Sequence, residues 1–175
     1  SMVLPFFGHF PVLTHASTNI FSNGFEPDFS GWTSVDQTSG ESKGWKIVGN
    51  GYEGAKRAQA EGNGSNKVLL KEISTVGLEN ISLSFYHKDS GLETADSVVV
   101  QYFNGTSWIN VTTFTDGNEV NDSSSNAWVN FSQSLGSDAN NLATFAIRFV
   151  SSLDTASDKF DLDAVSITGD EIEEV

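Results

Sequence analysis

The chain has 175 residues, of which 38% are hydrophobic and 18% are charged. A length of this order suits one domain, and the composition is too apolar and too weakly charged for a disordered chain. The formal net charge is −14, from 23 acidic and 9 basic side chains. Because affinity for a phosphate backbone comes from Lys and Arg, this charge argues against nucleic acid as a partner and against an anionic membrane surface.

The absence of cysteine and of long apolar runs limits the chain further. Without cysteine, neither a disulfide framework nor a thiolate metal site can form. The sequence has no run of 18 or more apolar residues, so we expect no membrane-spanning helix. Asn-X-Ser/Thr sequons, which permit a glycosylated, secreted protein without proving one, begin at Asn63, Asn80, Asn104, Asn110, Asn121 and Asn130.

Residues 1–18 are expected to lie outside the domain, as an ordered flank or the remnant of a cleaved tag. Within them, residues 3–13 are apolar and interrupted by proline, but they lack the charged start and the cleavage site of a signal peptide. We expect this stretch to cover an exposed sheet edge. The alternative is an arm that completes the sheet of a neighbouring molecule.

Short strands separated by turn signals follow along the chain, with no helical periodicity of useful length. The clearest alternation is in residues 81–88, where the odd positions face the core and Tyr86 and Lys88 fall on the other face. Asn104-Gly105 is a strong hairpin signal. We predict strands at 45–48, 52–60, 68–72, 81–88, 97–103, 107–111, 128–131, 143–150 and 160–168. This pattern is typical of a two-sheet sandwich.

Four motifs occur in a fixed order: Asn23-Gly24-Phe25-Glu26, Leu83-Ser84-Phe85-Tyr86, Asn104-Gly105-Thr106-Ser107-Trp108 and Asp163-Ala164-Val165-Ser166-Ile167. Over roughly residues 20–169, this order resembles secreted β jelly-roll modules of the carbohydrate-binding and MAM-like kind, in the galactose-binding-like superfamily. The resemblance implies an all-β, two-sheet antiparallel β-sandwich with jelly-roll topology over residues 19–169, at an extracellular or cell-surface location. Residues 170–175 are then the start of an acidic linker.

The resemblance also implies a structural calcium ion between the first and last motifs. Calcium prefers about six to eight oxygen ligands. In the family, the carboxylates correspond to Glu26 and Asp163, and a backbone carbonyl comes from the Gly54-Ala55-Lys56 segment, which we assign to Lys56. Ala164 departs from the usual second acidic or amide residue of the last motif, which removes a spare ligand. The alternative is that both carboxylates only cap turns or form salt bridges.

A second acidic group is formed by residues 93–96 together with Asp154 and Asp158. Loops of this composition can gather an ion at the surface. More often they are solvated turns.

Binding a sugar requires an aromatic face against the C–H surface of the ring and polar side chains that hydrogen-bond its hydroxyls. We predict one binding face, formed by Tyr86, Lys88, Gln101 and Arg148 on strands that lie side by side and flanked by Trp45 and Tyr52. The alternative for any single aromatic residue is core packing. We expect core or hairpin packing for Trp32, Trp108 and Trp128.

Catalysis finds little support in the sequence. The histidines lie in no metal-ligand spacing, His87 falls on the core-facing side of its strand, and no nucleophile or phosphate-loop motif is present. We therefore predict a non-catalytic, extracellular, calcium-stabilised module of a larger surface protein, which binds a glycan or polysaccharide or acts in adhesion. The alternative is a structural building block of a surface filament, adhesin or other assembly, whose partners are other surface proteins.

Overall fold

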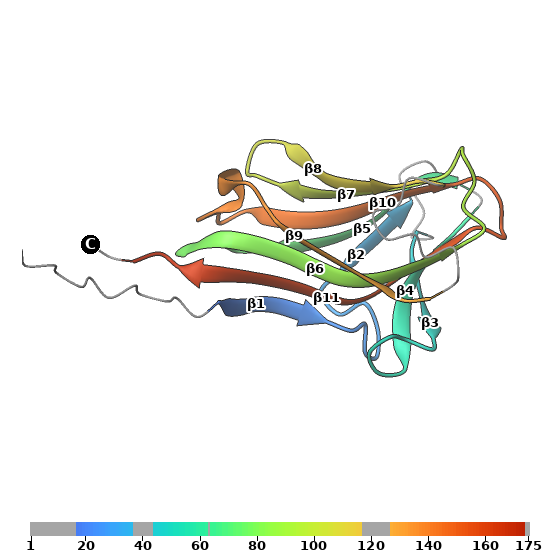
Figure 1. The fold of residues 1–175 in the computed structure, drawn as a ribbon, viewed down its shortest axis with the longest axis horizontal. Helices are drawn as coiled ribbons and strands as arrows, with labels where there is room; N and C mark the ends of the chain where they lie inside the picture. Colours follow the sequence, from blue (N-terminus) through green and yellow to red (C-terminus); the bar gives the residue numbers. More distant parts are fainter. Residues whose placement is uncertain (1–16, 37–43, 63, 117–126, 174–175) are drawn as a thin grey trace, which may run out of the picture.

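The computed structural model describes residues 17–36, 44–62, 64–116 and 127–173, and in them eleven strands form two sheets (Figure 1). Sheet A has the order β3 (Lys46–Gly49), β4 (Lys56–Glu61), β11 (Lys159–Glu171), β6 (Leu78–Ser90) and β9 (Val129–Ser134), and β1 (Thr18–Asn23) also pairs with β11. Sheet B has the order β2 (Thr33–Asp36), β5 (Gly64–Ile73), β10 (Phe145–Leu153), β7 (Ser97–Phe103) and β8 (Trp108–Phe114). A short 3-10 helix, η1 (Ser137–Ala139), follows β9.

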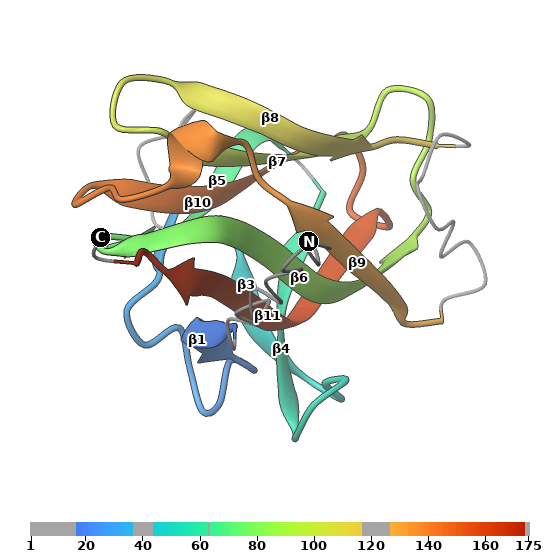
Figure 2. The same cartoon turned by 60° about the vertical axis from the view of Figure 1, so that its left-hand side comes forward.

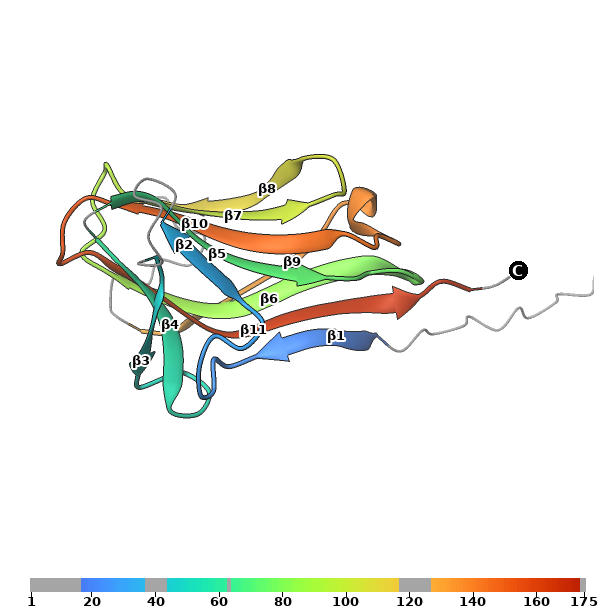
Figure 3. The same ribbon diagram turned by 180° about the vertical axis from the view of Figure 1, so that it is seen from behind.

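All of these strand pairs are antiparallel, and the two sheets stack face to face. Figure 2 shows β8, β7 and β10 above β6 and β11, and Figure 3 shows the same two layers from behind. The predicted all-β, two-sheet antiparallel sandwich with jelly-roll topology is therefore confirmed.

The core lies between the sheets and is built largely from aromatic rings. Phe85 of β6 meets Phe149 of β10 across the interface, with ring centroids 5.2 Å apart. Both side chains are fully buried. Burying apolar surface stabilises the fold by roughly 25 cal/mol per Å². The strand faces that carry such rings therefore point inward.

Strands β6 and β7 alternate as the sequence predicts, with every second residue buried. The outward face of sheet A therefore carries Tyr86 and Lys88 of β6. The outward face of sheet B carries Gln101 and Phe103 of β7. These four side chains thus lie on opposite sides of the sandwich.

Strand β11 changes partner and phase at a bulge. It pairs with β4 up to Leu162 and with β1 from Val165 onward, and its register against β6 shifts between Asp163 and Ser166. Ala164 lies in this bulge with a φ of 47°, in the left-handed region. A bulge redirects the side chains around it, and here it leaves Asp163 fully buried.

The strand predicted at residues 52–60 begins only at Lys56. The preceding backbone N–H groups of Tyr52, Glu53 and Ala55 bond to side-chain carboxylates, so they are not available to a strand partner. At the other end of the chain β11 extends to Glu171. The apolar stretch at residues 3–13 lies outside the described residues, so its role stays a prediction.

No helix in the described part of the chain is long and apolar enough to cross a membrane.

Candidate functional site

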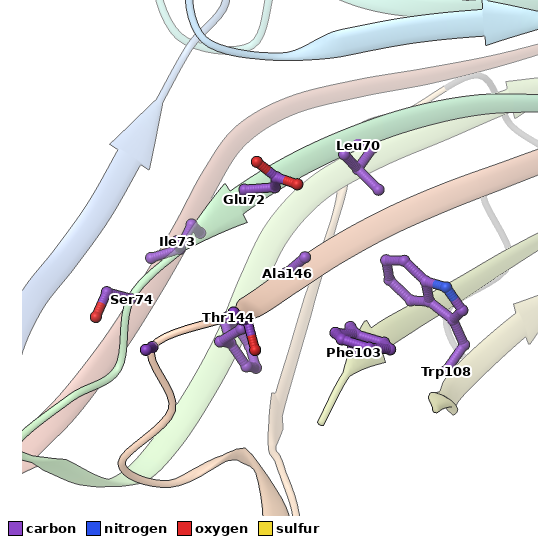
Figure 4. Close-up of a pocket in the computed structure, with 10 residues that line it drawn as sticks. Leu70, Glu72, Ile73, Ser74, Phe103, Trp108, Thr144 and Ala146 are labelled. Carbon is purple, nitrogen blue, oxygen red and sulfur yellow. The ribbon is translucent and has the colours of Figure 1, made fainter. Parts of the chain in front are cut away.

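A groove of about 530 Å³ opens on the outward face of sheet B (Figure 4). Phe103 and Trp108 lie on one side of it and Glu72 lies on the other. The full lining comprises Leu70, Glu72, Ile73, Ser74, Phe103, Trp108, Ala143, Thr144, Phe145 and Ala146.

The groove exists because one small residue lies between larger neighbours. Ala146 of β10 pairs with Phe103 of β7 on one side and with Glu72 of β5 on the other. Its methyl group fills little of the space between these side chains. The floor of the groove is therefore low at Ala146. The rings of Phe103 and Trp108, which we call the aromatic wall, stand above it.

The aromatic wall is set by the hairpin between β7 and β8. Phe103 and Trp108 are cross-strand partners, with ring centroids 5.4 Å apart and an angle of 48° between the rings. The side-chain oxygen of Asn104 accepts hydrogen bonds from the backbone N–H groups of Thr106 and Ser107, at 3.0 and 2.9 Å. Such Asx turns shape tight connections, and this one holds Trp108 at the start of β8.

A chain of polar side chains continues from Trp108 along the same face. The guanidinium carbon of Arg148 lies 4.0 Å from the Trp108 ring centroid. Arg148 Nε donates to Gln101 Oε1, and Gln101 Nε2 donates to Asn110 Oδ1, each at 2.7 Å. Burial lowers the pKa of the Arg148 guanidinium from its ordinary value. This network fixes the indole beside the groove and supplies polar groups at its end.

The predicted binding face is therefore split between the two sheets. Gln101 and Arg148 do lie together, on sheet B. Tyr86 and Lys88 lie on sheet A instead, where Tyr52 of the loop before β4 stacks on Tyr86, so the prediction of one continuous face is wrong. The alternation of each strand sets which residues face outward, but it does not specify to which sheet the strand belongs.

Trp45 is not available to a ligand, which is a further correction. It is 3% exposed and packs against Phe149 and Phe160 with ring centroids 6.1 and 6.2 Å away. Its Nε1 donates to the carbonyl oxygen of Lys67 at 3.3 Å. In the core, the large apolar surface of Trp45 is buried and its one hydrogen-bond donor has an acceptor.

Trp108 is a residue of the groove that its sequence context does not indicate. Trp32 is buried as predicted, and Trp108 packs across its hairpin as predicted. Trp128 differs from the prediction, because it is only partly buried and packs against Tyr52 on the outward face of sheet A. However, Trp108 also lines the groove, together with its partner Phe103. For Phe103 the signal was present: Val98, Val100 and Tyr102 alternate inward, which leaves Phe103 on the outward face.

The two predicted carboxylate ligands converge on one loop, between β3 and β4. Asp163 Oδ2 accepts the N–H groups of Tyr52 and Glu53, at 2.6 and 3.0 Å. Glu26 Oε1 accepts the N–H groups of Ala55 and Lys56, each at 2.5 Å. The first and last motifs of the sequence therefore meet here.

Backbone and carboxylate oxygen atoms lie close together beside Asp163. A Cβ placed on Gly51 would clash with the Lys56 carbonyl oxygen and would stand 2.7 Å from Asp163 Oδ2. Asp163 is fully buried, and no Lys or Arg of the described residues forms an ion pair with it. Burial raises the pKa of Asp163, against hydrogen bonds from the loop that lower it. Two carboxylates and one carbonyl are oxygen ligands of the kind that calcium prefers, so their chemistry suits the ion. Both carboxylates also accept backbone N–H groups of the loop, as the alternative of turn capping predicts.

The second acidic group is more buried than a solvated turn. Asp96, Asp154 and Asp158 bring carboxylate oxygens within 4.8 Å of one another, and Asp96 and Asp158 are buried. Burial and the two neighbouring carboxylates raise the pKa of Asp154. Asp96 also accepts the backbone N–H of Glu93 and that of Asp154, so it ties two loops together.

No protein-family model matches the chain, and no curated protein matches it in sequence. Solved structures do match. The K3 cleaved adhesin domain of Lys-gingipain from Porphyromonas gingivalis superposes with a TM-score of 0.64 and 14% identity, over 87% of this chain and 99% of that domain. The CBM22-1 xylan-binding domain of Xyn10C from Paenibacillus barcinonensis gives 0.60 and 15% identity, over 92% and 100%.

A third solved structure is TmCBM61 in complex with β-1,4-galactotriose, with a TM-score of 0.58 and 16% identity, over 86% of this chain and 97% of that one. At this level of identity the likeness concerns the fold. The chain therefore has the β-sandwich fold of carbohydrate-binding modules and of adhesin domains.

Proposed function

We propose that this chain is a non-catalytic glycan-binding module, and that its ligand is a neutral polysaccharide in the sheet B groove. The observation that carries this proposal is the aromatic wall of Phe103 and Trp108 beside a low floor at Ala146. Aromatic rings accept the C–H face of a pyranose, and a few polar groups fix its orientation. Glu72, Ser74 and Thr144 supply such groups in the groove.

The similarity to the xylan-binding domain and to the galactotriose-bound module supports this proposal. Both have the same sandwich architecture. An extracellular or cell-surface location, within a larger surface protein, is part of the proposal. It accords with the net charge of −14 and with the similarity to adhesin domains.

The test is retention of the folded chain on soluble xylan and on β-1,4-galactan, measured by affinity electrophoresis. Trp108→Ala removes the indole from the aromatic wall and leaves Phe103, and we expect the affinity of the groove for the polysaccharide to fall by at least about tenfold, which is about 1.4 kcal/mol. Ala146→Leu fills the floor and is expected to weaken binding as much while it keeps the fold.

Val76→Ala is the matched control, because Val76 is 59% exposed and lies outside the groove. It should bind as the unaltered chain does. Equal retention of the two groove variants and the unaltered chain would contradict the groove as a ligand site.

Calcium is the second part of the proposal. We infer that Glu26, Asp163 and the Lys56 carbonyl hold a structural calcium ion, which neutralises the buried carboxylate of Asp163. The ion would tie the end of β1 to β11 and fix the loop that precedes β4. Its role is to stabilise the fold, outside the sheet B groove.

An adhesion module that contacts other surface proteins is the alternative function. The likeness to several Lys-gingipain adhesin domains favours it. The two functions separate in one experiment: a folded, unaltered chain that no polysaccharide retains would favour the protein-binding role.

A further inference from the structure

The outward face of sheet A carries a cluster of aromatic side chains that the sheet B groove does not use. Tyr52 stacks on Tyr86 with ring centroids 3.6 Å apart and an angle of 13° between the rings. Trp128 meets Tyr52 edge to face at 6.0 Å. Lys88 Nζ lies 5.1 Å above the Trp128 ring. We call these four residues the sheet A cluster.

The cluster reaches solvent through Tyr52, unlike the aromatic residues of the core. Tyr52 is 46% exposed, Tyr86 and Trp128 are partly buried, and the Lys88 side chain is 15% exposed. Few large apolar side chains of the described residues are as exposed as Tyr52. Exposed aromatic surface at one place is a feature of binding sites. The parallel stack leaves the second face of Tyr52 free of Tyr86.

The rings are held in place before any ligand arrives. The backbone N–H of Tyr52 donates to Asp163 Oδ2 at 2.6 Å, so the loop that carries the ring is fixed to β11. Tyr86 is on β6, directly opposite Asp163 in the strand register. Because these groups are already ordered, binding would lose little conformational entropy.

The charges around the cluster indicate an uncharged ligand. Lys88 Nζ lies 3.9 Å from Asp161 Oδ2, and Arg57 Nε lies 2.8 Å from Asp161 Oδ1, so the two cations share one carboxylate. Glu53 follows Tyr52 in the loop, and the whole chain has a net charge of −14. An anionic polymer would meet this field unfavourably. A neutral sugar ring can use the aromatic surface without that cost.

We propose that the sheet A cluster is a second saccharide-binding site, which takes a neutral polysaccharide against the exposed face of Tyr52. It lies on the opposite side of the sandwich from the sheet B groove. One molecule can therefore hold two polysaccharide chains at once. Binding at the cluster does not depend on the proposed function of the groove, whereas this cross-linking does.

The test uses the full chain in the Trp108→Ala background, which weakens the groove. We expect this variant to keep measurable retention on soluble xylan or β-1,4-galactan, and Tyr52→Ala added to it to lower that affinity by at least about tenfold. Tyr52→Phe keeps the stacked ring and should keep most of the affinity. Val76→Ala in the same background is the control, and circular dichroism confirms that each variant is folded.

Cross-linking is measured separately, as the turbidity of a polysaccharide solution on addition of protein. The unaltered chain should raise turbidity, and either single variant, Tyr52→Ala or Trp108→Ala, should abolish the rise. Polygalacturonate, an anionic polymer, should be retained less well than the neutral polymers.

The outcomes separate the two proposals. If Tyr52→Ala binds and cross-links as the unaltered chain does, or if folded Trp108→Ala is retained by neither neutral polymer, the second site is wrong. Equal or better retention of polygalacturonate would overturn the choice of a neutral ligand. If Trp108→Ala changes nothing but Tyr52→Ala abolishes binding, the groove is wrong and the sheet A cluster stands alone.

Discussion

His87 is a histidine in an almost wholly aromatic environment. It is fully buried, stacks on Phe160 with ring centroids 5.5 Å apart, and lies 4.4 Å from the ring of Phe114. Neither ring nitrogen has a hydrogen-bond partner among the described residues. Burial lowers the pKa of His87 to about 4. The imidazole is therefore neutral in the folded protein at any pH near neutrality.

This neutral histidine predicts a loss of stability in mild acid. In the unfolded chain the pKa of histidine is about 6.5, so the unfolded state takes up the proton first as the pH falls. The contribution of neutral His87 to the free energy of unfolding is complete above about pH 6.5. It decreases as the pH falls and is gone at about pH 4, a total loss of about 3 kcal/mol. Urea unfolding at a series of pH values measures it.

His87→Leu is the control for this effect. Leucine fills a similar volume and leaves no buried nitrogen without a partner, so the variant should be at least as stable at pH 7. Its free energy of unfolding should also depend much less on pH between about pH 4 and pH 6.5. The raised pKa of Asp163 acts in the opposite direction, because the folded state then binds its proton more tightly. An unchanged slope in His87→Leu would contradict the assignment to this residue.

At the scale of single elements, the bulge of β11 places an alanine in a strained backbone conformation. Ala164 has a φ of 47°, and a residue with a Cβ in the left-handed region costs roughly 1–2 kcal/mol. Glycine has no such cost, although it loses more entropy on folding. We expect Ala164→Gly to raise the free energy of unfolding by about 0.5–1 kcal/mol.

Thermal unfolding of matched variants checks this prediction. Ala58→Gly, in β4, is the comparison, because Ala58 is buried and has no positive φ. That variant should lose stability. If Ala164→Gly destabilises as much as Ala58→Gly does, the bulge is not strained at this residue.

The strands themselves show how far the sequence could lead. The alternation in residues 81–88 correctly indicates which side chains of β6 face inward, because burial on one face requires period two. The same rule separates Gln101 from its buried neighbours in β7. It could not show that Tyr86 and Gln101 belong to different sheets, since strand order depends on pairings between distant parts of the chain. The burial of Trp45 cannot be predicted from alternation, because it precedes a short strand in which buried and exposed residues do not alternate.

Of the candidate sites, one can be predicted from the sequence and one cannot. The meeting of Glu26 with Asp163 at one loop was predicted by resemblance, from the motifs at the two ends of the sequence. The groove was not, because it depends on the small size of Ala146 between two cross-strand neighbours. Such a depression becomes visible only when three strands from separate parts of the chain lie side by side.

At the scale of the whole molecule, the calcium proposal predicts a large thermal effect. A ligand at a hundred times its Kd that binds only the folded state stabilises it by about 2.7 kcal/mol. For a chain of this size the melting temperature should rise by roughly 5–10 °C in calcium over chelator. Differential scanning calorimetry in the two buffers measures the shift.

Two variants locate the ion. Asp163→Asn should abolish the shift, because it removes the buried one of the two carboxylate ligands at the proposed calcium site. Asp154→Asn, in the second acidic group, should leave the shift in place. Equal melting temperatures of the unaltered chain in the two buffers would rule out a stabilising ion, and loss of the shift only in Asp154→Asn would move it to the second group.

The pairing of β1 with β11 has a mechanical consequence. Thr18 lies opposite Gly169, so the outer ends of the two strands leave the sheet at the same side. Tension applied between those ends would peel β1 away one ladder rung at a time, which takes far less force than sliding the strands past each other. After β1 itself, the next contacts that resist peeling are the hydrogen bonds that Glu26 accepts from Ala55 and Lys56. Rupture force in a single-molecule pulling experiment should therefore depend on that carboxylate more than on any residue of β1 itself.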